Sequence, residues 1–337
     1  MDRLAAIQQW LIEIGKPLSG LAAASNDASF RRYFRGWYTS NAQRVSYIVM
    51  DAPPDKENSA PFCDIAHLLE LLSVPATRVV AADLERGFLL LTDLGSDTLL
   101  TALSENPHAR AGLYAQALEL LEPLQSTGAS VAVENGIILP AYTRKRLATE
   151  CSEFQEWLLE RHLSLNLTAK QIDTLNSTIR LVLDSASAQP QVMVHLDYHS
   201  RNLMVGPDGQ ISGMLDFQDA VIGALTYDAV SLLRDAYIQL EADEIAEWLE
   251  TYRQQVAPNV DANTFTQWFD WMGLQRHIKV AGRFCRLNYR DGKSAYMGDI
   301  PLTLRYIREV AGKYPEFEEF CVLLDELVLP AFPESYD

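Results

Sequence analysis

Apolar residues recur at intervals of three or four along much of the chain, the spacing that places them on one face of a helix. This pattern predicts helices from Arg3 to Ile14 and from Pro61 to Leu72. Other segments alternate or stay continuously apolar, which is typical of strands: 29–38, 44–50, 77–82 and 88–91. We therefore expect the first part of the chain to form a small sheet accompanied by helices.

Beyond Leu94 and Gly95 the periodicity is mostly helical, over 113–124, 172–183, 229–240, 245–252 and 265–287. The prediction is an α+β fold with a small mixed β-sheet lobe over residues 1–93 and a larger, mainly helical lobe over 94–337. A chain of 337 residues is long enough to bury a core in each lobe.

One short hairpin interrupts the helical pattern of the second part. The apolar strand 192–194 leads into His195, and the segment 202–205 is a second short strand. Gly206-Pro207-Asp208-Gly209 is a typical turn, and 210–215 is the returning strand. Such a hairpin brings Asn202 and Asp216 to the same end.

The residue types around this hairpin suit phosphoryl transfer from a magnesium nucleotide. Asp197 would accept the proton of an acceptor hydroxyl, and Asn202 and Asp216 would hold Mg²⁺ through oxygen atoms. The alternative is a surface hairpin with solvated acidic residues. That alternative does not explain why an apolar strand delivers His195 and Asp197 directly into the loop.

Three neighbours of Asp197 are further candidates. His195 is expected to brace the loop through backbone hydrogen bonds, the position it has in kinase catalytic loops. His199 and Arg201 could each contact the transferring phosphate, where positive charge stabilises the transition state. We place His199 among the substrate-binding candidates, whereas Arg201 could equally pair with a carboxylate of the loop.

Charge and composition narrow the possible partners. The net charge of −17 argues against nucleic acid or an anionic membrane as a partner. No apolar run reaches the length of a membrane span, and residues 1–10 lack the features of a signal peptide. The four cysteines are widely separated, which favours reduced thiols in the cytoplasm over zinc or disulfides. No protein partner is evident.

The segment from His195 to Asn202, with Asp216-Phe217, resembles the aminoglycoside phosphotransferase and choline kinase branch of the protein-kinase-like fold. The later segment Thr226-Tyr227-Asp228-Ala229-Val230 also matches this branch. The resemblance implies that Asp228 supports the catalytic loop from the head of a helix. An ordinary helix cap at Asp228 is compatible with the same sequence.

The same resemblance implies a nucleotide site in the small lobe. The strand that leaves this lobe would offer backbone groups of Thr92, Asp93 and Leu94 to an adenine. A phosphate-covering loop would correspond to 22–30, where glycine is absent; Ser25, Asn26 and Ser29 could bind phosphate there, although a simple strand turn is the competing interpretation.

Met50 occupies the strand position at which kinases usually have a lysine. Another cation would have to replace that charge. Arg31, Arg32 and Arg35 are the nearest candidates, with Lys56 as a further one. Alternation puts Arg31 and Arg35 on one face of the strand and Arg32 on the other, and the sequence does not say which face meets the nucleotide.

Several segments narrow the resemblance: 24–35, 49–54, 84–95, 273–280, 290–293 and 296–301. Together they are similar to the bacterial kinases that phosphorylate the anomeric hydroxyl of N-acetylmuramate and N-acetylglucosamine. The resemblance spans nearly the whole chain. It implies an ATP-dependent, Mg²⁺-requiring enzyme that forms the α-1-phosphate of a free amino sugar in peptidoglycan recycling.

A sugar acid has a carboxylate, for which a fork-shaped arginine is a natural receptor. Arg276 and His277 are the main candidates in the predicted helix 265–287, which also bears Lys279, Arg283 and Arg286. Tyr296 and Asp299, in the segment after it, could bind sugar hydroxyls. In so acidic a protein, the cluster could instead neutralise neighbouring carboxylates.

Two other functions remain open from the sequence alone. The chain could phosphorylate an aminoglycoside or a choline-like amine, because an acidic protein suits a cationic substrate. It could also be a catalytically silent nucleotide-binding module, given Met50 in place of the lysine. The presence of Asp197, Asn202 and Asp216 favours an active enzyme.

Overall fold

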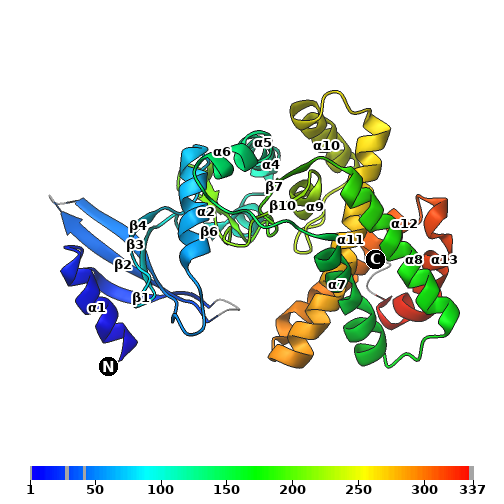
Figure 1. Cartoon of the computed structure of the whole chain (residues 1–337), viewed down its shortest axis with the longest axis horizontal. Coiled ribbons are helices and arrows are strands. Elements are labelled where there is room, and N and C mark those ends of the chain that lie inside the picture. Colours follow the sequence, from blue (N-terminus) through cyan, green and yellow to red (C-terminus); the bar gives the residue numbers. More distant parts are fainter. Residues whose placement is uncertain (1, 27–29, 41–42, 334–337) are drawn as a thin grey trace. The chain divides into compact units, whose positions relative to one another are not determined.

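The computed structural model describes residues 2–26, 30–40 and 43–333 of the chain (Figure 1). Two compact units interleave in sequence. The first comprises Met1–Gln116, Ser130–Ile138 and Arg201–Asp219, and the second comprises Ala117–Ala129, Leu139–Ser200 and Ala220–Asp337. The predicted lobe boundary between residues 93 and 94 stays a prediction, because the two units do not divide there and Arg201–Asp219 groups with the first unit.

The first unit contains a five-stranded sheet in the order β1-β2-β3-β5-β4. Its strands are β1 (Ser19–Asn26), β2 (Arg32–Ser40), β3 (Gln43–Asp51), β4 (Val79–Asp83) and β5 (Phe88–Thr92). Every neighbouring pair is antiparallel, so the expected mixed sheet is wrong in this respect. The reason is that β2–β3 and β4–β5 are hairpins, and β5 pairs back onto β3.

Gly87 fixes the turn between β4 and β5 against the end of β3. Its φ is +74°, and a Cβ at this position would lie 1.9 Å from the carbonyl oxygen of Ala52. The Ala52 N–H donates to the Gly87 carbonyl at 2.8 Å. Only glycine fits this close approach, which joins the two hairpins into one sheet.

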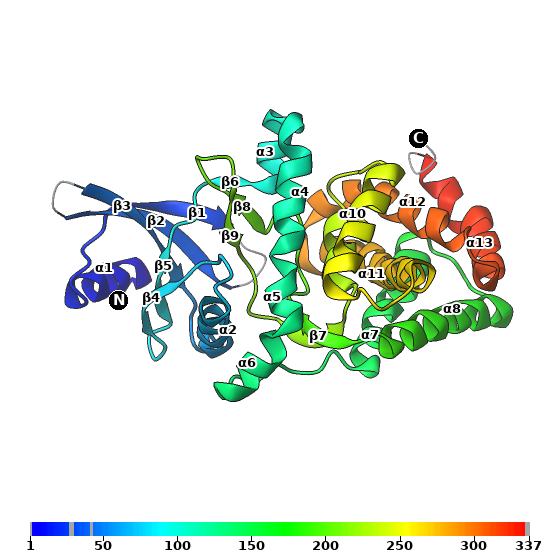
Figure 2. The same cartoon turned by 90° about the horizontal axis from the view of Figure 1, so that it is seen from above.

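Helix α1 (Arg3–Glu13) covers one face of this sheet (Figures 1 and 2). Ile7, Trp10 and Leu11 are buried against Val49 and Phe88, as their helical spacing predicts. Since directly paired residues of neighbouring strands point to one face, Arg32 and Asp51 lie on the α1 face as well. Tyr33 and Met50, one position away on each strand, point to the opposite face.

The rest of the first unit includes a three-stranded antiparallel sheet made of β6 (Asp97–Thr98), β8 (Leu203–Val205) and β9 (Ile211–Met214). This unit also contains α2 (Ala60–Leu71), α3 (Leu99–Glu105) and most of α4 (Arg110–Glu119) and α6 (Gly128–Glu134), whereas α5 (Leu121–Ser126) belongs to the second unit. The helix expected over 113–124 is therefore broken near Leu120 into two. The predicted hairpin over 202–215 is confirmed as β8 and β9 with a turn at 206–209.

The second unit is mainly helical around a two-stranded sheet of β7 (Gln191–Val194) and β10 (Val221–Ala224). Besides α5, its helices are α7 (Arg144–Glu153), a π-helical continuation (Phe154–His162), α8 (Ala169–Ala188), α9 (Tyr227–Leu233), α10 (Ala242–Val256), α11 (Ala262–Asp291), α12 (Ile300–Ala311) and α13 (Glu318–Leu323). The helix expected over 229–240 ends already at Leu233. Sequence periodicity did not reveal β10, which has only four residues.

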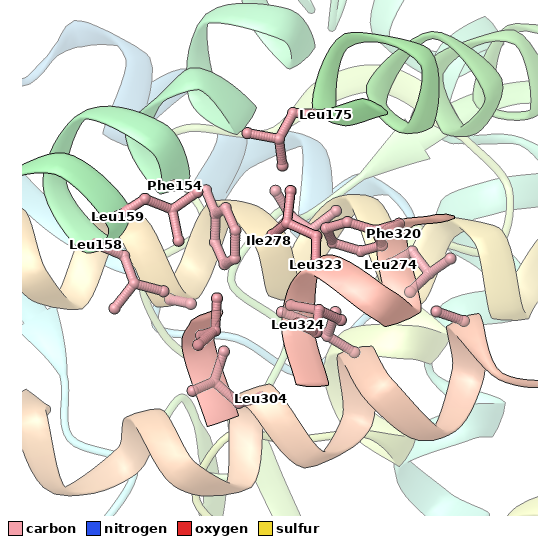
Figure 3. Packing of buried hydrophobic residues seen from close by; sticks show 14 of the residues in the cluster. Phe154, Leu158, Leu159, Leu175, Leu274, Ile278, Leu304, Phe320, Leu323 and Leu324 are labelled. Carbon is pink, nitrogen blue, oxygen red and sulfur yellow. The ribbon is translucent and has the colours of Figure 1, made fainter. Parts of the chain in front are cut away.

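Helix α11 is the centre of this unit's core. Figure 3 shows Leu175, Ile278, Leu304 and Phe320 pointing toward one another from α8, α11, α12 and α13. Each of these side chains is nearly or fully buried, and burying a side chain of this size contributes about 2 kcal/mol. The packing fixes α11 along its length, and with it the polar residues on its other faces.

Candidate active site

The loop after β7 is held in a strained conformation by one carboxylate. Leu196, a non-glycine residue, has a φ of +79°. Asp228, near the start of α9, accepts hydrogen bonds from the backbone N–H groups of His195 at 2.7 Å and Leu196 at 3.1 Å. Thr226, not Asp228, occupies the N-cap position of α9, and the side chain of Asp228 binds the loop instead.

His195 is buried beneath this loop and contacts it. The Nδ1 atom accepts a hydrogen bond from the backbone N–H of Asp197 at 3.3 Å. The imidazole also meets the ring of Tyr198 edge-on, with centroids 5.6 Å apart, and the Tyr198 hydroxyl donates to the Ala117 carbonyl at 2.6 Å. These contacts are those of a residue that braces the loop.

Asp197 lies partly exposed on this loop among positive charges. Burial acts to raise the pKa of its carboxyl, but attraction by Lys279, then by His199, His195 and Arg276, holds that pKa below its usual range. Burial raises the pKa of Asp228 to about 7, although its two backbone donors favour the ionised form. Asp197 is thus the carboxylate of the pair that stays charged at low pH.

Lys279 on α11 is the strongest of these positive charges and belongs to a buried polar cluster. Its Nζ lies 3.1 Å from Glu150 Oε2, 3.1 Å from the Tyr227 hydroxyl and 3.3 Å from the Tyr142 hydroxyl. Burial disfavours the charged lysine, but Tyr227, Glu150 and Asp197 raise the pKa of its ammonium above the ordinary value. The cluster therefore holds a charged lysine at a position from which it attracts the carboxylate of Asp197 electrostatically.

A close helix crossing brings the carboxylates of α7 to α11. A Cβ at Gly282 would lie 2.3 Å from the carbonyl carbon of Glu153, so the two backbones meet at a distance that only glycine allows. Glu150 and Glu153 then face α11. Arg283 binds Glu153 through two hydrogen bonds of 2.7 and 3.0 Å.

Asn202 and Asp216, the two candidates for metal binding through side-chain oxygen atoms, lie at the hairpin of the first unit. The Leu215 N–H donates to the Asn202 carbonyl at 2.8 Å, which closes the open end of the hairpin and places Asn202 and Asp216 next to it. Asp216 has a φ of +61°, and Phe217 packs on Phe62 with ring centroids 4.8 Å apart. The backbone turns sharply at Asp216 while the following aromatic side chain anchors the turn.

One carboxamide oxygen and one carboxylate oxygen at one end of a hairpin fit Mg²⁺, which completes its shell with water and substrate phosphates. In the described part of the chain, no cluster of three or more histidine, cysteine or acidic side chains could by itself enclose a metal ion. The donor set at Asn202 and Asp216 therefore suits a metal that arrives with a nucleotide.

The arginines near the start of β2 are each paired with a carboxylate. Arg31 lies 3.4 Å from Glu57, and Arg35 binds Asp93 at 2.7 Å and the Gly95 carbonyl at 2.6 Å. Arg32 and Arg3 both bind the fully buried Asp51. Arg32 is thus on the α1 face, away from Met50, which argues against a phosphate contact for Arg32.

The segment expected to cover phosphates is largely a strand. Ser25 and Asn26 lie in β1, paired with Tyr33 and Arg32, whereas Ser29 lies outside the described residues. At the end of β5, the Thr92 hydroxyl accepts from the Arg78 N–H at 2.9 Å. The Leu94 carbonyl accepts from the Ser212 hydroxyl at 2.8 Å, and Asp93 is bound by Arg35.

The candidates for sugar binding have different surroundings. His277 is fully buried, stacks on Tyr306 with centroids 5.0 Å apart, and has its Nε2 2.9 Å from the Arg234 carbonyl. Burial, followed by the charge of Arg276, lowers the pKa of His277 to about 3. The expectation that His277 contacts the sugar is therefore not supported by its position, which indicates a neutral packing residue.

The other candidates are closer to the surface. Tyr296 stacks on Phe284 with centroids 5.3 Å apart, and the Asp299 carbonyl accepts from the Thr303 hydroxyl at 2.9 Å. His199 meets the ring of Tyr237 edge-on at 5.3 Å. Arg201 is exposed. Arg276, in contrast, is buried, with 5% of its surface exposed, and its positive charge helps to lower the pKa of Asp197.

Lys279 was only a weak candidate from sequence reasoning, and Glu150, Tyr142 and Tyr227 were not candidates. Their convergence depends on the crossing of α7 and α11 and could not be found from spacing. One signal was available: Tyr227 directly precedes Asp228. Adjacent helix residues point about a quarter turn apart, so one serves the loop and the other the cluster.

Comparison with known proteins agrees with this geometry. Residues 20–262 match the family described as "Phosphotransferase enzyme family". A curated protein of Pseudomonas putida, "N-acetylmuramate/N-acetylglucosamine kinase", is 42% identical, with 92% of this chain and 89% of the relative covered. A protein of the same name from Neisseria meningitidis is 40% identical, with 97% of each chain covered.

Solved structures share the fold at low identity. An aminoglycoside 2'-phosphotransferase-IIIa bound to GDP has a TM-score of 0.61 and 15% identity, covering 93% of this chain and 100% of that one. A choline kinase from Streptococcus pneumoniae has a TM-score of 0.57 and 12% identity, covering 92% and 100%. These likenesses confirm the predicted protein-kinase-like fold. In the described part of the chain, none of the helices has both the length and the apolar character to span a membrane.

Proposed function

The chain belongs to the phosphotransferase enzyme family, and we propose that it transfers the γ-phosphoryl group of ATP to the anomeric hydroxyl of N-acetylmuramate and N-acetylglucosamine. It is an ATP-dependent phosphotransferase with a hydroxyl group as acceptor. The product would be the α-1-phosphate, formed in the recycling of peptidoglycan sugars. The observation that supports this acceptor is the 40–42% identity, over nearly the whole chain, to kinases named for these two sugars.

Asp197 would act as the general base. Its carboxylate takes the proton of the anomeric hydroxyl while the hydroxyl oxygen bonds to the γ-phosphorus, and the bond from that phosphorus to the β-phosphate oxygen breaks to release ADP. An anomeric hydroxyl is more acidic than an ordinary alcohol, so a carboxylate of low pKa suffices. His195 and Asp228 position the base by holding its loop.

Asn202 and Asp216 are the residues that would hold Mg²⁺. When bound, the ion supplies positive charge to the nucleotide phosphates. His199 and Arg201 precede Asn202 in the sequence and would add positive charge near the phosphoryl group that is transferred.

Arg31 is the arginine that best replaces the missing strand lysine. Its ion pair with Glu57, in the segment before α2, is of the kind that a strand lysine and a helix glutamate form in kinases. The backbone of Thr92, Asp93 and Leu94 would receive the adenine, and Ser25 and Asn26 at the end of β1 are the candidates for the phosphates. Tyr296 and Asp299 are the remaining candidates for the sugar hydroxyls.

The proposal is tested by Mg²⁺-ATP consumption with N-acetylmuramate, N-acetylglucosamine, an aminoglycoside and choline. We expect turnover with the two amino sugars and a phosphate on C1 in the α configuration, identified by ³¹P and ¹H NMR. Phosphate at another position, or turnover with the aminoglycoside or choline alone, contradicts the proposed acceptor. Nucleotide binding without any turnover identifies a silent module instead.

A further inference from the structure

Three cations on one face of α11 differ in whether each has a carboxylate of its own. Arg276, Lys279 and Arg283 follow one another at i, i+3 and i+7 and therefore share a face. Lys279 is paired with Glu150, and Arg283 with Glu153. For Arg276, the described residues include no carboxylate within ion-pair distance.

The guanidinium of Arg276 is also poorly satisfied by hydrogen bonds. The residue is only 5% exposed, and its buried Nη1 has no hydrogen-bond partner among the residues that the structure describes. A buried guanidinium without partners is costly, because it loses water and gains nothing in exchange. Such a group is expected where a ligand supplies the missing acceptor.

The surroundings of Arg276 indicate that this ligand binds near the general base. About one turn from Arg276 on the same face, Lys279 contacts the Tyr227 hydroxyl at 3.1 Å, and the neighbouring Asp228 holds the loop of Asp197. In keeping with this position, the charge of Arg276 acts to lower the pKa of both Asp197 and Asp228. Asp228 accepts hydrogen bonds from two backbone N–H groups and has no hydrogen bond or ion pair with Arg276. The donors of Arg276 thus lie in the electrostatic neighbourhood of Asp197 and stay available to an anion.

The two proposed sugars differ in one anionic group. N-acetylmuramate has a lactyl ether with a carboxylate on O3, where N-acetylglucosamine has a hydroxyl. C1 and C3 belong to the same ring, so a hydroxyl on C1 held at Asp197 leaves the carboxylate within one sugar's width of the base. A guanidinium fork binds a carboxylate through two parallel hydrogen bonds.

We propose that Arg276 binds the lactyl carboxylate of N-acetylmuramate and thereby sets the preference between the two sugars. This inference rests on the proposed function of the chain. Lys279 and Arg283 are less suited to this role, because Glu150 and Glu153 already occupy their donors. Arg276 acts on substrate choice, whereas Asp197 acts on both sugars alike.

The test removes the charge from the protein and from the ligand in turn. Arg276→Met is expected to lower kcat/KM for N-acetylmuramate about 100-fold more than for N-acetylglucosamine. The unaltered enzyme is expected to lose a similar factor when the lactyl carboxylate is replaced by a carboxamide. Arg276→Met should no longer distinguish the carboxylate from the carboxamide.

Arg283→Met is the matched control. It removes a guanidinium from the same face of the same helix, two turns away, whose partner is Glu153. We expect it to lower kcat/KM for both sugars by the same factor, so the ratio between them stays constant. A change of this ratio in Arg283→Met as large as in Arg276→Met overturns the assignment, because any loss of α11 charge would then have the same effect.

Arg276→Lys keeps the test decisive if the methionine variant does not fold. It retains the charge but not the fork, and we expect the ratio between the sugars to fall about 10-fold. An equal loss with both sugars in Arg276→Lys overturns the proposal and assigns Arg276 to the transferring phosphoryl group. If the unaltered enzyme phosphorylates neither sugar, the proposed function fails, and calorimetric binding of N-acetylmuramate and its carboxamide still decides the role of Arg276.

Discussion

The five-stranded sheet and the face of α11 both gather positive charge, but they balance it differently. Around β2, every one of three arginines has a carboxylate partner: Arg31 with Glu57, Arg32 with Asp51 and Arg35 with Asp93. Along α11, Lys279 and Arg283 are paired in the same way, whereas Arg276 is not. The difference separates cations whose charge is balanced by a carboxylate of the chain from a buried cation that has no such partner among the described residues.

The sheet pairs join elements that are distant in sequence. Asp51, at the end of β3, is bound by Arg3 of α1 and by Arg32 of β2, so one buried carboxylate connects a helix to two strands. Arg35 connects β2 to the segment after β5 through Asp93 and Gly95. Charges used in this way are neutralised within the fold.

The largest expected effect comes from substituting Asp197, the proposed base, on which the cations of α11 act. Asp197→Asn removes the proton acceptor but keeps the shape and the hydrogen bonds of the loop. We expect kcat to fall about 10³-fold, the usual contribution of a general base. The affinity for Mg²⁺-ATP should stay within about two-fold, because the base does not bind the nucleotide.

Turnover by stopped assay and nucleotide binding by calorimetry measure these two quantities. Near-normal turnover in Asp197→Asn refutes the assignment of Asp197 as the base. A parallel loss of nucleotide affinity indicates instead that Asp197 helps to hold the metal ion. Thermal melting of the variant confirms that the loop and the second unit remain folded.

The second prediction concerns the ion pairs that Asp51 forms at the five-stranded sheet. Asp51→Asn leaves Arg3 and Arg32 without their shared carboxylate, and both arginines are partly exposed and can be hydrated. We therefore expect a loss of about 2 kcal/mol in the free energy of unfolding, less than for a pair buried on both sides. Urea unfolding measures this loss.

Asp325→Asn is the control for Asp51→Asn. Asp325 also binds an arginine, Arg308, through two hydrogen bonds, but both side chains are exposed. Its loss should change the free energy of unfolding by less than about 0.5 kcal/mol. If the two variants lose the same free energy of unfolding, the burial of Asp51 does not strengthen its ion pairs, and its link between α1 and the sheet adds no special stability.

Most of the architecture could be predicted from local patterns. The helical spacing of 3–14 and the alternation of the first strands correspond closely to α1, β2 and β3, because each element buries one regular face. The antiparallel order of the sheet could not be obtained this way. It depends on the contact of Gly87 with Ala52, which joins segments far apart in the chain.

The candidate site shows the same limit. Asp197, Asn202 and Asp216 were found because they are close in sequence and their spacing reflects one loop and one hairpin. Lys279 and Glu150 come from α11 and α7, and they meet only because Gly282 allows the two helices to cross. Spacing along the chain contains no information about such a crossing.

The smallest expected effect comes from substituting Lys279 of α11, which influences the pKa of Asp197. Lys279 is the main attraction that holds the pKa of Asp197 down against burial, so removing it raises that pKa. A base of higher pKa becomes protonated at higher pH, and the acid limb of the kcat/KM profile therefore moves to higher pH in Lys279→Met. At neutral pH we expect a loss of only about 10-fold, the effect of removing one positive charge near the base.

Three variants separate this effect from damage to the fold. Lys279→Arg keeps the charge, and its acid limb should stay near that of the unaltered enzyme. Lys313→Met removes a lysine that pairs with another buried carboxylate, Asp270, and should leave the limb in place. His199, His195, Arg276 and Asp228 also act on Asp197, but they are the same in all variants, so only the charge at position 279 differs. A shift in Lys279→Arg equal to that in Lys279→Met would show that the packing of the lysine, and not its charge, controls the base.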